Sequence, residues 1–137
     1  MRHWLFKSEP DSYSIEDLRR DGSTFWDGVR NYQARNHMRS MQPGDLGFFY
    51  HSQKGREVVG VVEVTAACHP DSTSDDPRWD CVDVRALRPF ARPVTLDAIR
   101  ADPDLAEMVL VRNSRLSVQP VTPEEWHGIC ALGGTEP

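Results

Sequence analysis

A valine-rich run over residues 57–65 limits the possible folds more than any other feature of this sequence. Gly60 interrupts the run and indicates a bend or a close approach of another part of the backbone. Five valines divide between the two faces of an extended strand here, with Val58, Val62 and Val64 on one face and Val59 and Val61 on the other. A strand that is apolar on both faces belongs at the centre of a sheet or in the wall of a barrel.

The remaining segments predict further short strands with short helices between them. Residues 69–77 are rich in Pro, Asp and Ser and are expected to form a loop. Strands are expected over residues 2–7, 46–51, 81–87 and 116–118, and helices over 14–18, 31–41, 96–100 and 122–132. Regular alternation of strand and helix is missing, which argues against a doubly wound parallel sheet. The pattern therefore predicts an α+β fold, a small mixed sheet or barrel whose ends are covered by helices.

Two of these helices have clear start signals. Ser14 is followed three residues later by Asp17, an N-cap pair, and Thr122-Pro123 places a capping hydroxyl before a proline in the first turn. In the helix over 31–41, a core-facing stripe is expected from Ala34, Met38 and Met41, which stand at helical spacing.

Length, charge and cysteine content narrow the class of protein. The 137 residues suit a single domain, and no stretch is apolar enough to span a membrane or to act as a signal peptide. The three cysteines are odd in number and widely spaced, which does not suit a disulfide framework. They favour a reducing compartment, the cytoplasm or, in a eukaryote, the nucleus. Cys68, His69 and Cys81 are too sparse a set to predict a metal site. No sequence feature indicates oligomerisation, and a monomer is expected.

The net charge of −5 argues against general, salt-driven coating of nucleic acid. The charge is unevenly spread, however, because residues 28–44 and 108–123 contain arginines and no carboxylate. An acidic protein can present one positive face. Uneven scatter without any such face is the alternative.

Four segments carry side chains suited to binding a ligand. The first ends the first strand at Lys7, Ser8 and Glu9, which bring together an amine, a hydroxyl and a carboxylate. No G-x-S-x-G turn surrounds Ser8, and no histidine stands at an informative spacing, so nucleophilic catalysis has no support there. Taken alone, this segment is more simply a solvated turn at the end of a strand.

The second and fourth segments suit a planar base and its phosphates. In residues 26–32, Trp26 and Tyr32 offer flat faces for stacking, and Asn31 offers a donor and an acceptor to a base edge. The alternative is that Trp26 is a core residue, although Asp-Gly follows it rather than an apolar run. Residues 112–118 combine two arginines, an asparagine and serines without an acid, which suits phosphate contacts or simple solvation.

The third segment, residues 48–52, is an aromatic strand that ends in polar groups. Phe48 and Tyr50 are expected to point to one side and Phe49 and His51 to the other, so that one pair joins the core and the other borders a pocket. His51 lacks an identifiable partner for a role as general base, and a structural histidine is the alternative.

Together these segments resemble the EVE domain, a member of the PUA-like group that also contains the YTH readers. The matching stretches are residues 4–10, 26–36, 44–52, 59–64 and 114–121, and the most specific are Trp-Asp-Gly-Val-Arg-Asn-Tyr at 26–32 and Phe-Tyr-His-Ser at 49–52. The resemblance implies one EVE domain over residues 1–137, with a PUA-like mixed β-barrel of five to six strands decorated by short helices.

The resemblance further implies a non-catalytic module, without a cofactor, that reads a modified base in an aromatic pocket. The expected partner is DNA carrying 5-methyl- or 5-hydroxymethylcytosine, or modified RNA. The implied pocket draws on Lys7, Ser8, Trp26, Asn31, Tyr32, Tyr50, His51 and Ser52, with Ser114, Arg115, Leu116 and Ser117 beside it and Arg30, Arg35 or Arg115 on flanking phosphates.

Two other function classes remain open at this point. The acidic charge fits a pocket for a free nucleoside or another small planar ligand better than a polyanion site. An enzyme acting on a modified base would use Glu9, Asp27 or His51, but no spacing marks a nucleophile–base pair.

Overall fold

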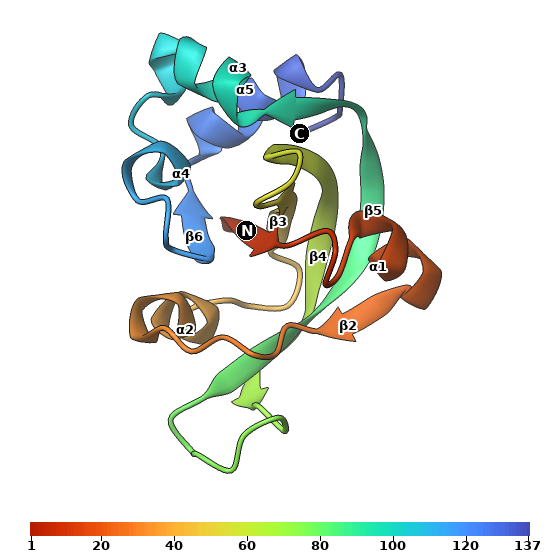
Figure 1. Ribbon diagram of the computed structural model, residues 1–137, viewed down its shortest axis with the longest axis vertical. Coiled ribbons are helices and arrows are strands. Elements are labelled where there is room, and N and C mark those ends of the chain that lie inside the picture. Colours follow the sequence, from red (N-terminus) through yellow and green to blue (C-terminus); the bar gives the residue numbers. More distant parts are fainter.

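The computed structural model describes residues 1–137 as one mixed six-stranded sheet with five α-helices and one short 3-10 helix, η1 (Pro103–Leu105) (Figure 1). The strands are β1 (His3–Ser8), β2 (Ser23–Phe25), β3 (Leu46–His51), β4 (Glu57–Pro70), β5 (Asp80–Thr95) and β6 (Val118–Val121). The α-helices are α1 (Ile15–Asp21), α2 (Tyr32–Arg39), α3 (Leu96–Ala101), α4 (Val109–Arg112) and α5 (Pro123–Leu132). None of the helices has the length and apolar character needed to span a lipid bilayer.

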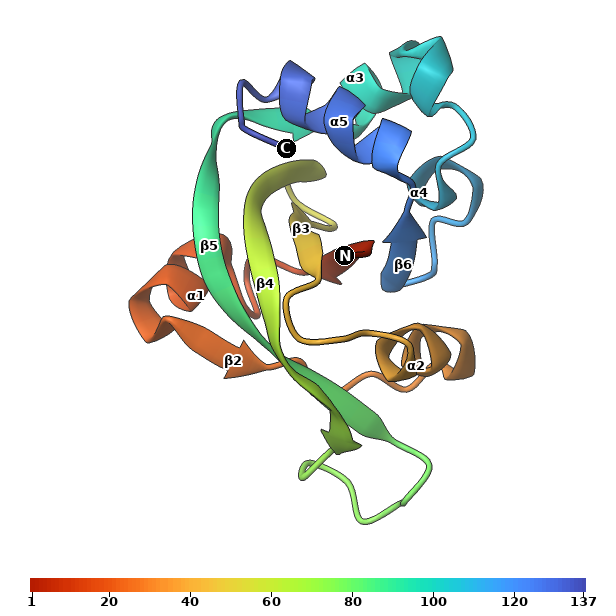
Figure 2. The same ribbon diagram turned by 180° about the vertical axis from the view of Figure 1, so that it is seen from behind.

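The sheet has the strand order β2-β5-β4-β3-β1-β6 and is strongly curved (Figures 1 and 2). The strands β1 and β3 are parallel, and every other neighbouring pair is antiparallel. The outer strands β2 and β6 do not pair with each other, and α2 lies across the opening, in contact with β4, β5 and β6. The expected α+β mixed barrel of five to six strands with short helices is confirmed, with six strands.

Two apolar clusters pack on opposite faces of this sheet. The first cluster lies beneath α3, α4 and α5 and is centred on Trp126, which stacks on Phe48 with ring centroids 3.9 Å apart. The second cluster lies beneath α1 and α2 and contains Phe6 and Phe49. As expected from the pleat, Phe48 and Tyr50 belong to the first cluster and Phe49 to the second.

The expected division of the valines in β4 is wrong for Val58 and Val59, which have exchanged faces, and Val59 packs against the second cluster. Val58 lies in the first cluster together with Val61, whereas Val62 and Val64 lie in the second. The register between β3 and β4 shifts here, because Phe49 pairs with Gly60 and Tyr50 with Val58, which leaves Val59 as an extra residue on β4. An extra residue reverses the alternation of side chains between the two faces, so Val58 and Val59 lie on the faces opposite to those expected.

The other differences from the expectation concern strand ends. β5 continues well past residue 87, and Pro89 stands opposite Gly60, next to a register shift where a missing N–H is tolerated. β4 extends to Pro70 into the expected loop, and β6 begins at Val118, so that residues 116 and 117 precede it. The short elements β2 and α4 have no strong local pattern and were not expected.

The helix signals are confirmed by the observed caps. Ser14 and Thr122 each form a capping box with the residue three positions later. The stripe of Ala34, Met38 and Met41 is buried, with at most 1% of each residue exposed.

Candidate functional site

Two hollows lie side by side at the carboxyl end of β1. The tryptophan hollow, of about 490 Å³, is lined by Lys7, Ser8, Glu9, Ser12, Tyr13, Thr24, Phe25, Trp26, Asp27, Gly28, Val29, Arg30 and Ser117. The arginine hollow, of about 690 Å³, is lined by Lys7, Glu9, Tyr50, Ser52, Gln53, Arg56, Leu96, Arg100, Leu110, Ser114, Arg115 and Ser117. Both share Lys7, Glu9 and Ser117, which form the wall between them.

Trp26 is a rigid wall of the tryptophan hollow. Its backbone N–H donates to the carbonyl of Val82 on β5 over 2.8 Å. Its ring packs edge-on against Phe6 and Phe49, with centroids 5.1 and 5.6 Å away, and only 8% of the residue is exposed. The two interpretations of Trp26 therefore hold together, because the ring belongs to the core on one side and lines the hollow on the other.

A buried carboxylate fixes the loop that follows Trp26. Asp71 accepts from the backbone N–H of Gly28 over 2.9 Å and from Arg30 Nη1 over 3.0 Å, and its other oxygen accepts from Thr73. Burial favours the protonated acid, but the bonds from Thr73, Arg30 and Gly28 outweigh it and hold the pKa of Asp71 well below its usual range. Gly28 has φ +76°, which glycine adopts without strain.

The tryptophan hollow contains two free carboxylates. The carboxylates of Glu9 and Asp27 make no hydrogen bond within the chain. Ser8 Oγ is already committed, because it donates to the carbonyl of Tyr13 over 2.6 Å. Burial raises the pKa of Tyr13, whose hydroxyl donates to Asp21, so this ring is a neutral wall. Unpaired carboxylates beside aromatic rings suit a planar ligand that carries an amino group.

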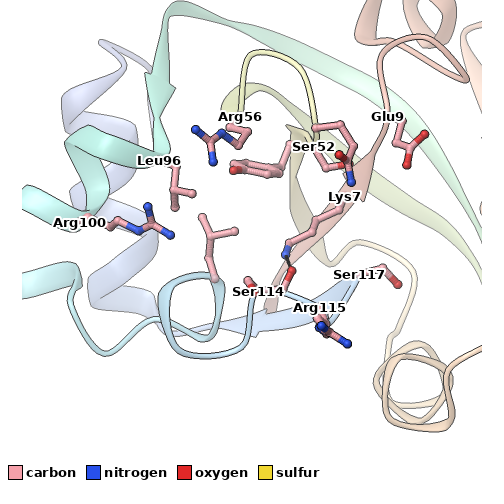
Figure 3. A pocket seen from close by; sticks show the side chains of 12 residues that line it. Lys7, Glu9, Ser52, Arg56, Leu96, Arg100, Ser114, Arg115 and Ser117 are labelled. Atoms are coloured by element: carbon pink, nitrogen blue, oxygen red, sulfur yellow. Dashed lines mark hydrogen bonds between the residues drawn. The ribbon is translucent and has the colours of Figure 1, made fainter.

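The arginine hollow is positively charged (Figure 3). Four cationic side chains and one carboxylate line it, and the Arg56, Arg100 and Lys7 side chains point into the same space from different elements. Lys7 Nζ donates to the carbonyl of Ser114 over 2.6 Å. Burial lowers the pKa of Lys7, since the surroundings disfavour its charge. Arg56, Arg100 and Arg115 make neither an ion pair nor a side-chain hydrogen bond within the chain.

Two of the expected site residues have internal roles outside both hollows. The side-chain oxygen of Asn31 accepts from the N–H of Ala34 and caps α2. His51 Nε2 accepts from the backbone N–H of Ile15 at the start of α1, and burial lowers the pKa of His51. His51 is therefore a neutral structural acceptor, the alternative that the sequence left open.

Three further expected residues also line neither hollow. Tyr32 is exposed and stacks on Trp79, with ring centroids 5.0 Å apart, and the guanidinium of Arg35 lies 4.9 Å from the Tyr32 ring centroid. Leu116 is 2% exposed and packs in the second cluster. The other expected residues line one or both hollows: Lys7, Ser8, Trp26, Arg30, Tyr50, Ser52, Ser114, Arg115 and Ser117.

The structure adds lining residues that the sequence did not single out as site residues. Tyr13 and Phe25 line the tryptophan hollow, and Arg56 and Arg100 line the arginine hollow. Arg56 follows Gly55 in the turn before β4, where a turn signal was visible. Arg100 lies on a short helix without any local mark, and only the fold brings it to the site.

One cluster outside both hollows has metal-ligating side chains. His69 Nε2 lies 2.7 Å from Asp83 Oδ1, and Cys81 Sγ lies 3.8 Å from His69 Nδ1. Burial first, and then the neighbouring carboxylates, raise the pKa of Cys81 to about 12. A cation would have to displace this thiol proton and break the His69–Asp83 pair, so the donor set does not favour a resident metal.

Comparison with known proteins places the chain in a family. The EVE domain family model matches residues 2–132. Thymocyte nuclear protein 1 of Gallus gallus is 38% identical over 169 residues, covering 98% of this chain and 70% of that protein. A crystal structure from Agrobacterium tumefaciens is 53% identical, with a TM-score of 0.97 and coverage of 98% and 94%.

One solved structure of a relative contains a ligand. The crystal structure of human THYN1 protein in complex with 5-methylcytosine-containing DNA is 36% identical to this chain, with a TM-score of 0.92. The match covers 100% of both chains. The sequence matches and these solved structures agree with the resemblance seen in the motifs, and the chain belongs to the EVE domain family.

Proposed function

We propose that this chain is a non-catalytic module that recognises 5-methylcytosine in DNA by holding the extruded base in the tryptophan hollow. The observation that carries the proposal is the likeness, over the whole length of both chains, to human THYN1 protein in complex with 5-methylcytosine-containing DNA. The walls of the hollow supply the chemistry that such a base requires.

Stacking offsets the cost of taking a base out of a duplex. Extrusion costs a few kcal/mol, and stacking on an aromatic ring contributes about 1–3 kcal/mol per base. Trp26 is already fixed by Phe6 and Phe49, so little side-chain entropy is lost when a base stacks on it. The rings of Tyr13 and Phe25 add apolar wall.

The polar groups of the hollow match cytosine. The exocyclic amine of cytosine is a donor, and carboxylates are its usual acceptors. Glu9 and Asp27 supply carboxylates that no group in the chain uses. Burying the 5-methyl group against apolar walls adds about 0.8 kcal/mol to the binding free energy. This amount corresponds to about a fourfold preference for 5-methylcytosine over cytosine.

A binding role agrees better with the site than catalysis does. Of the three candidates for acid–base chemistry, His51 lies outside both hollows and holds the first N–H of α1. Glu9 and Asp27 have no histidine, lysine or arginine paired with them to form a proton-transfer couple.

The proposed module acts as one domain over residues 1–137 and as a monomer, because both hollows are built from a single chain. Its three cysteines are free thiols, which fits a reducing compartment that holds DNA. In a cell without a nucleus this is the cytoplasm, and in a eukaryote the nucleus.

The test measures affinity for matched duplexes that differ at one base. Fluorescence anisotropy with cytosine, 5-methylcytosine and 5-hydroxymethylcytosine in the same DNA, and the corresponding RNA, gives the preference directly. We expect the 5-methylcytosine duplex to bind at least fourfold more tightly than the cytosine duplex. The exposed Asp27→Ala change should weaken binding about tenfold, the effect of one lost hydrogen bond to a charged group, without changing Tm.

Matched controls separate the hollow from the rest of the surface. Trp26→Phe keeps an aromatic ring against Phe6 and Phe49 but offers a smaller face for stacking. This change should lower the affinity for the 5-methylcytosine duplex. Tyr32→Ala removes an exposed aromatic ring that lines neither hollow, and it should leave the preference unchanged. Equal affinity for cytosine and 5-methylcytosine duplexes would refute the proposal. Equal affinity for the free nucleoside and the duplex would instead identify a small-ligand pocket.

A further inference from the structure

We infer that the arginine hollow binds the phosphodiester next to the recognised base, so that the chain selects a polynucleotide over a free nucleoside. This inference rests on the proposed function for the identity of the base. It adds a second subsite with its own residues and its own dependence on salt.

The cations of this hollow come from distant parts of the chain. Lys7 ends β1, Arg56 precedes β4, Arg100 lies on α3 and Arg115 lies between α4 and β6. The lining carries a net charge of +3 in a protein whose net charge is −5. Concave clusters of one sign focus the field and attract an anion even when the whole molecule repels it.

The arginines of the hollow are free to bind a ligand. Six other arginines of the chain pair with carboxylates, among them Arg39 with Asp80 and Arg85 with Glu63. The guanidinium groups of Arg56, Arg100 and Arg115 have no such partner and no other hydrogen bond within the chain. Their planar forks are therefore available to phosphate oxygens, which guanidinium groups bind through two parallel bonds.

The turn that carries Arg56 has a strained backbone conformation. Gln53 and Arg56 have φ of 68° and 44°, a region that residues other than glycine seldom adopt, and both line the hollow. The carbonyl of Arg56 accepts from the N–H of Leu96 at the start of α3 over 2.9 Å. This bond ties the turn with Arg56 to the helix with Arg100, so the two guanidiniums face the same space (Figure 3).

The arginine hollow lies beside the tryptophan hollow, so a phosphate bound there belongs to the same nucleic acid as the base. Lys7, Glu9 and Ser117 separate the two hollows, so a ligand in one lies within a single side-chain layer of the other. Glu9 lies on the opposite side of the arginine hollow from Arg100, where its charge does not face the guanidinium of Arg100 (Figure 3). The base and the phosphate of one nucleotide are close enough to occupy two adjacent hollows. The hydroxyls of Ser52, Ser114 and Tyr50 supply further donors to a phosphate.

The first experiment measures how salt changes the affinity for a duplex with one 5-methylcytosine. The variants are Arg100→Gln, Arg56→Asn and their combination, and asparagine is chosen because it tolerates the positive φ at that position. Each change should reduce the slope of log K against log salt by about 1 and weaken binding at low salt about tenfold. The preference for 5-methylcytosine over cytosine should stay within about twofold of wild type, because the base hollow is untouched.

Arg19→Gln is the matched control. Arg19 is an exposed arginine on α1 that lines neither hollow, and its removal changes the net charge by the same amount. This variant should keep the wild-type slope. If it lowers the slope as much as Arg100→Gln does, the effect is one of net charge and the inference is wrong.

The second experiment compares small ligands by calorimetry. 5-Methyl-2′-deoxycytidine 5′- and 3′-monophosphates are compared with the nucleoside and with inorganic phosphate. At least one nucleotide should bind more tightly than the nucleoside, and the combined variant should remove this advantage. Inorganic phosphate that binds as tightly as the nucleotide would overturn the inference in favour of a free-anion pocket.

The two proposals fail in different ways. A wild-type salt slope in the combined variant overturns the phosphate subsite, while weaker binding of the 5-methylcytosine duplex by Asp27→Ala still supports the base hollow. Absence of any preference for 5-methylcytosine in the wild type overturns the proposed function. The change in slope would then still show whether the arginine hollow holds a phosphate.

Discussion

Several side chains that look like ligand-binding groups in the sequence are used to hold the fold together. Ser8 donates to Tyr13, Asn31 caps α2 and His51 accepts from Ile15. The role of Asn31 was visible in principle, because it precedes a helix with an apolar stripe, where asparagine is a preferred cap. The role of His51 was not, because its partner lies 36 residues away.

Gly47 occupies a position beside the site where a side chain does not fit. A Cβ at this position of β3 would lie 2.5 Å from Phe6 Cε2 and 3.3 Å from Val62 Cγ2. Phe6 is fully buried and supports Trp26, so it cannot move aside without disturbing the tryptophan hollow. We expect Gly47→Ala to lower the free energy of unfolding in urea by about 1–3 kcal/mol and to weaken DNA binding.

Gly128→Ala is the control for this change. Gly128 lies in α5, and the nearest atom to its Cβ would be Leu105 Cδ2 at an ordinary 3.4 Å. Alanine should therefore stabilise the helix by about 0.5–1 kcal/mol. Wild-type stability in Gly47→Ala would show that Phe6 is less constrained than its packing indicates.

At the scale of elements, periodicity predicted which segments pair but not where they bend or end. The prolines at 89 and 93 resemble the end of a strand, yet β5 continues to Thr95 because Val94 and Thr95 pair with β4 beyond a register shift. β2 has three residues, two of them Ser23 and Thr24, and owes its strand form to pairing with β5 alone. Such elements depend on tertiary partners, which a local pattern does not contain.

Asp71 connects two loops whose pairing the sequence also did not show. It lies in the loop between β4 and β5 and holds the loop that follows Trp26. Its pKa is lower in the folded chain than the value of about 3.9 in an unfolded chain. The stability that it contributes is therefore fully present above about pH 4 and is lost as the pH falls through the folded-state pKa.

We expect Asp71→Asn to lower the free energy of unfolding by about 2 kcal/mol at neutral pH, because the amide keeps only one acceptor oxygen. Urea titrations at several pH values should show this difference shrinking below about pH 4. Asp75→Asn changes an exposed carboxylate in the same loop that has no hydrogen bond, and it should have little effect. A difference between Asp71→Asn and wild type that is independent of pH would contradict the assignment.

At the scale of the whole molecule, the positive surface is not the one that the sequence windows indicated. In residues 28–44, Arg30 and Arg39 pair with carboxylates. In residues 108–123, Arg112 pairs with Glu107, and only Arg115 lines the arginine hollow. The other three cationic side chains of the hollow come from residues far apart in the sequence. The two acid-free segments therefore contained only one of its four cationic residues.

The two apolar clusters should unfold as one unit, because a single sheet carries both. Neighbouring residues of β4 face opposite clusters, as Val61 and Val62 do, so melting one cluster removes the strand that supports the other.

Two thiols report on this cooperativity. Cys130 lies in the first cluster, and Cys81, which is 2% exposed, directly precedes Val82 of the second cluster on β5. Burial raises the pKa of these thiols to about 11 and about 12, respectively, so neither reacts until the chain opens. Labelling with a thiol reagent in increasing urea, followed by mass spectrometry, should give the same dependence on urea for both cysteines, equal to that of global unfolding.

Cys68, which is only partly buried, should label earlier through local opening. Labelling of Cys81 at clearly lower urea than Cys130 would mean that the β4–β5 end unfolds by itself, and the chain would then comprise two units rather than one domain.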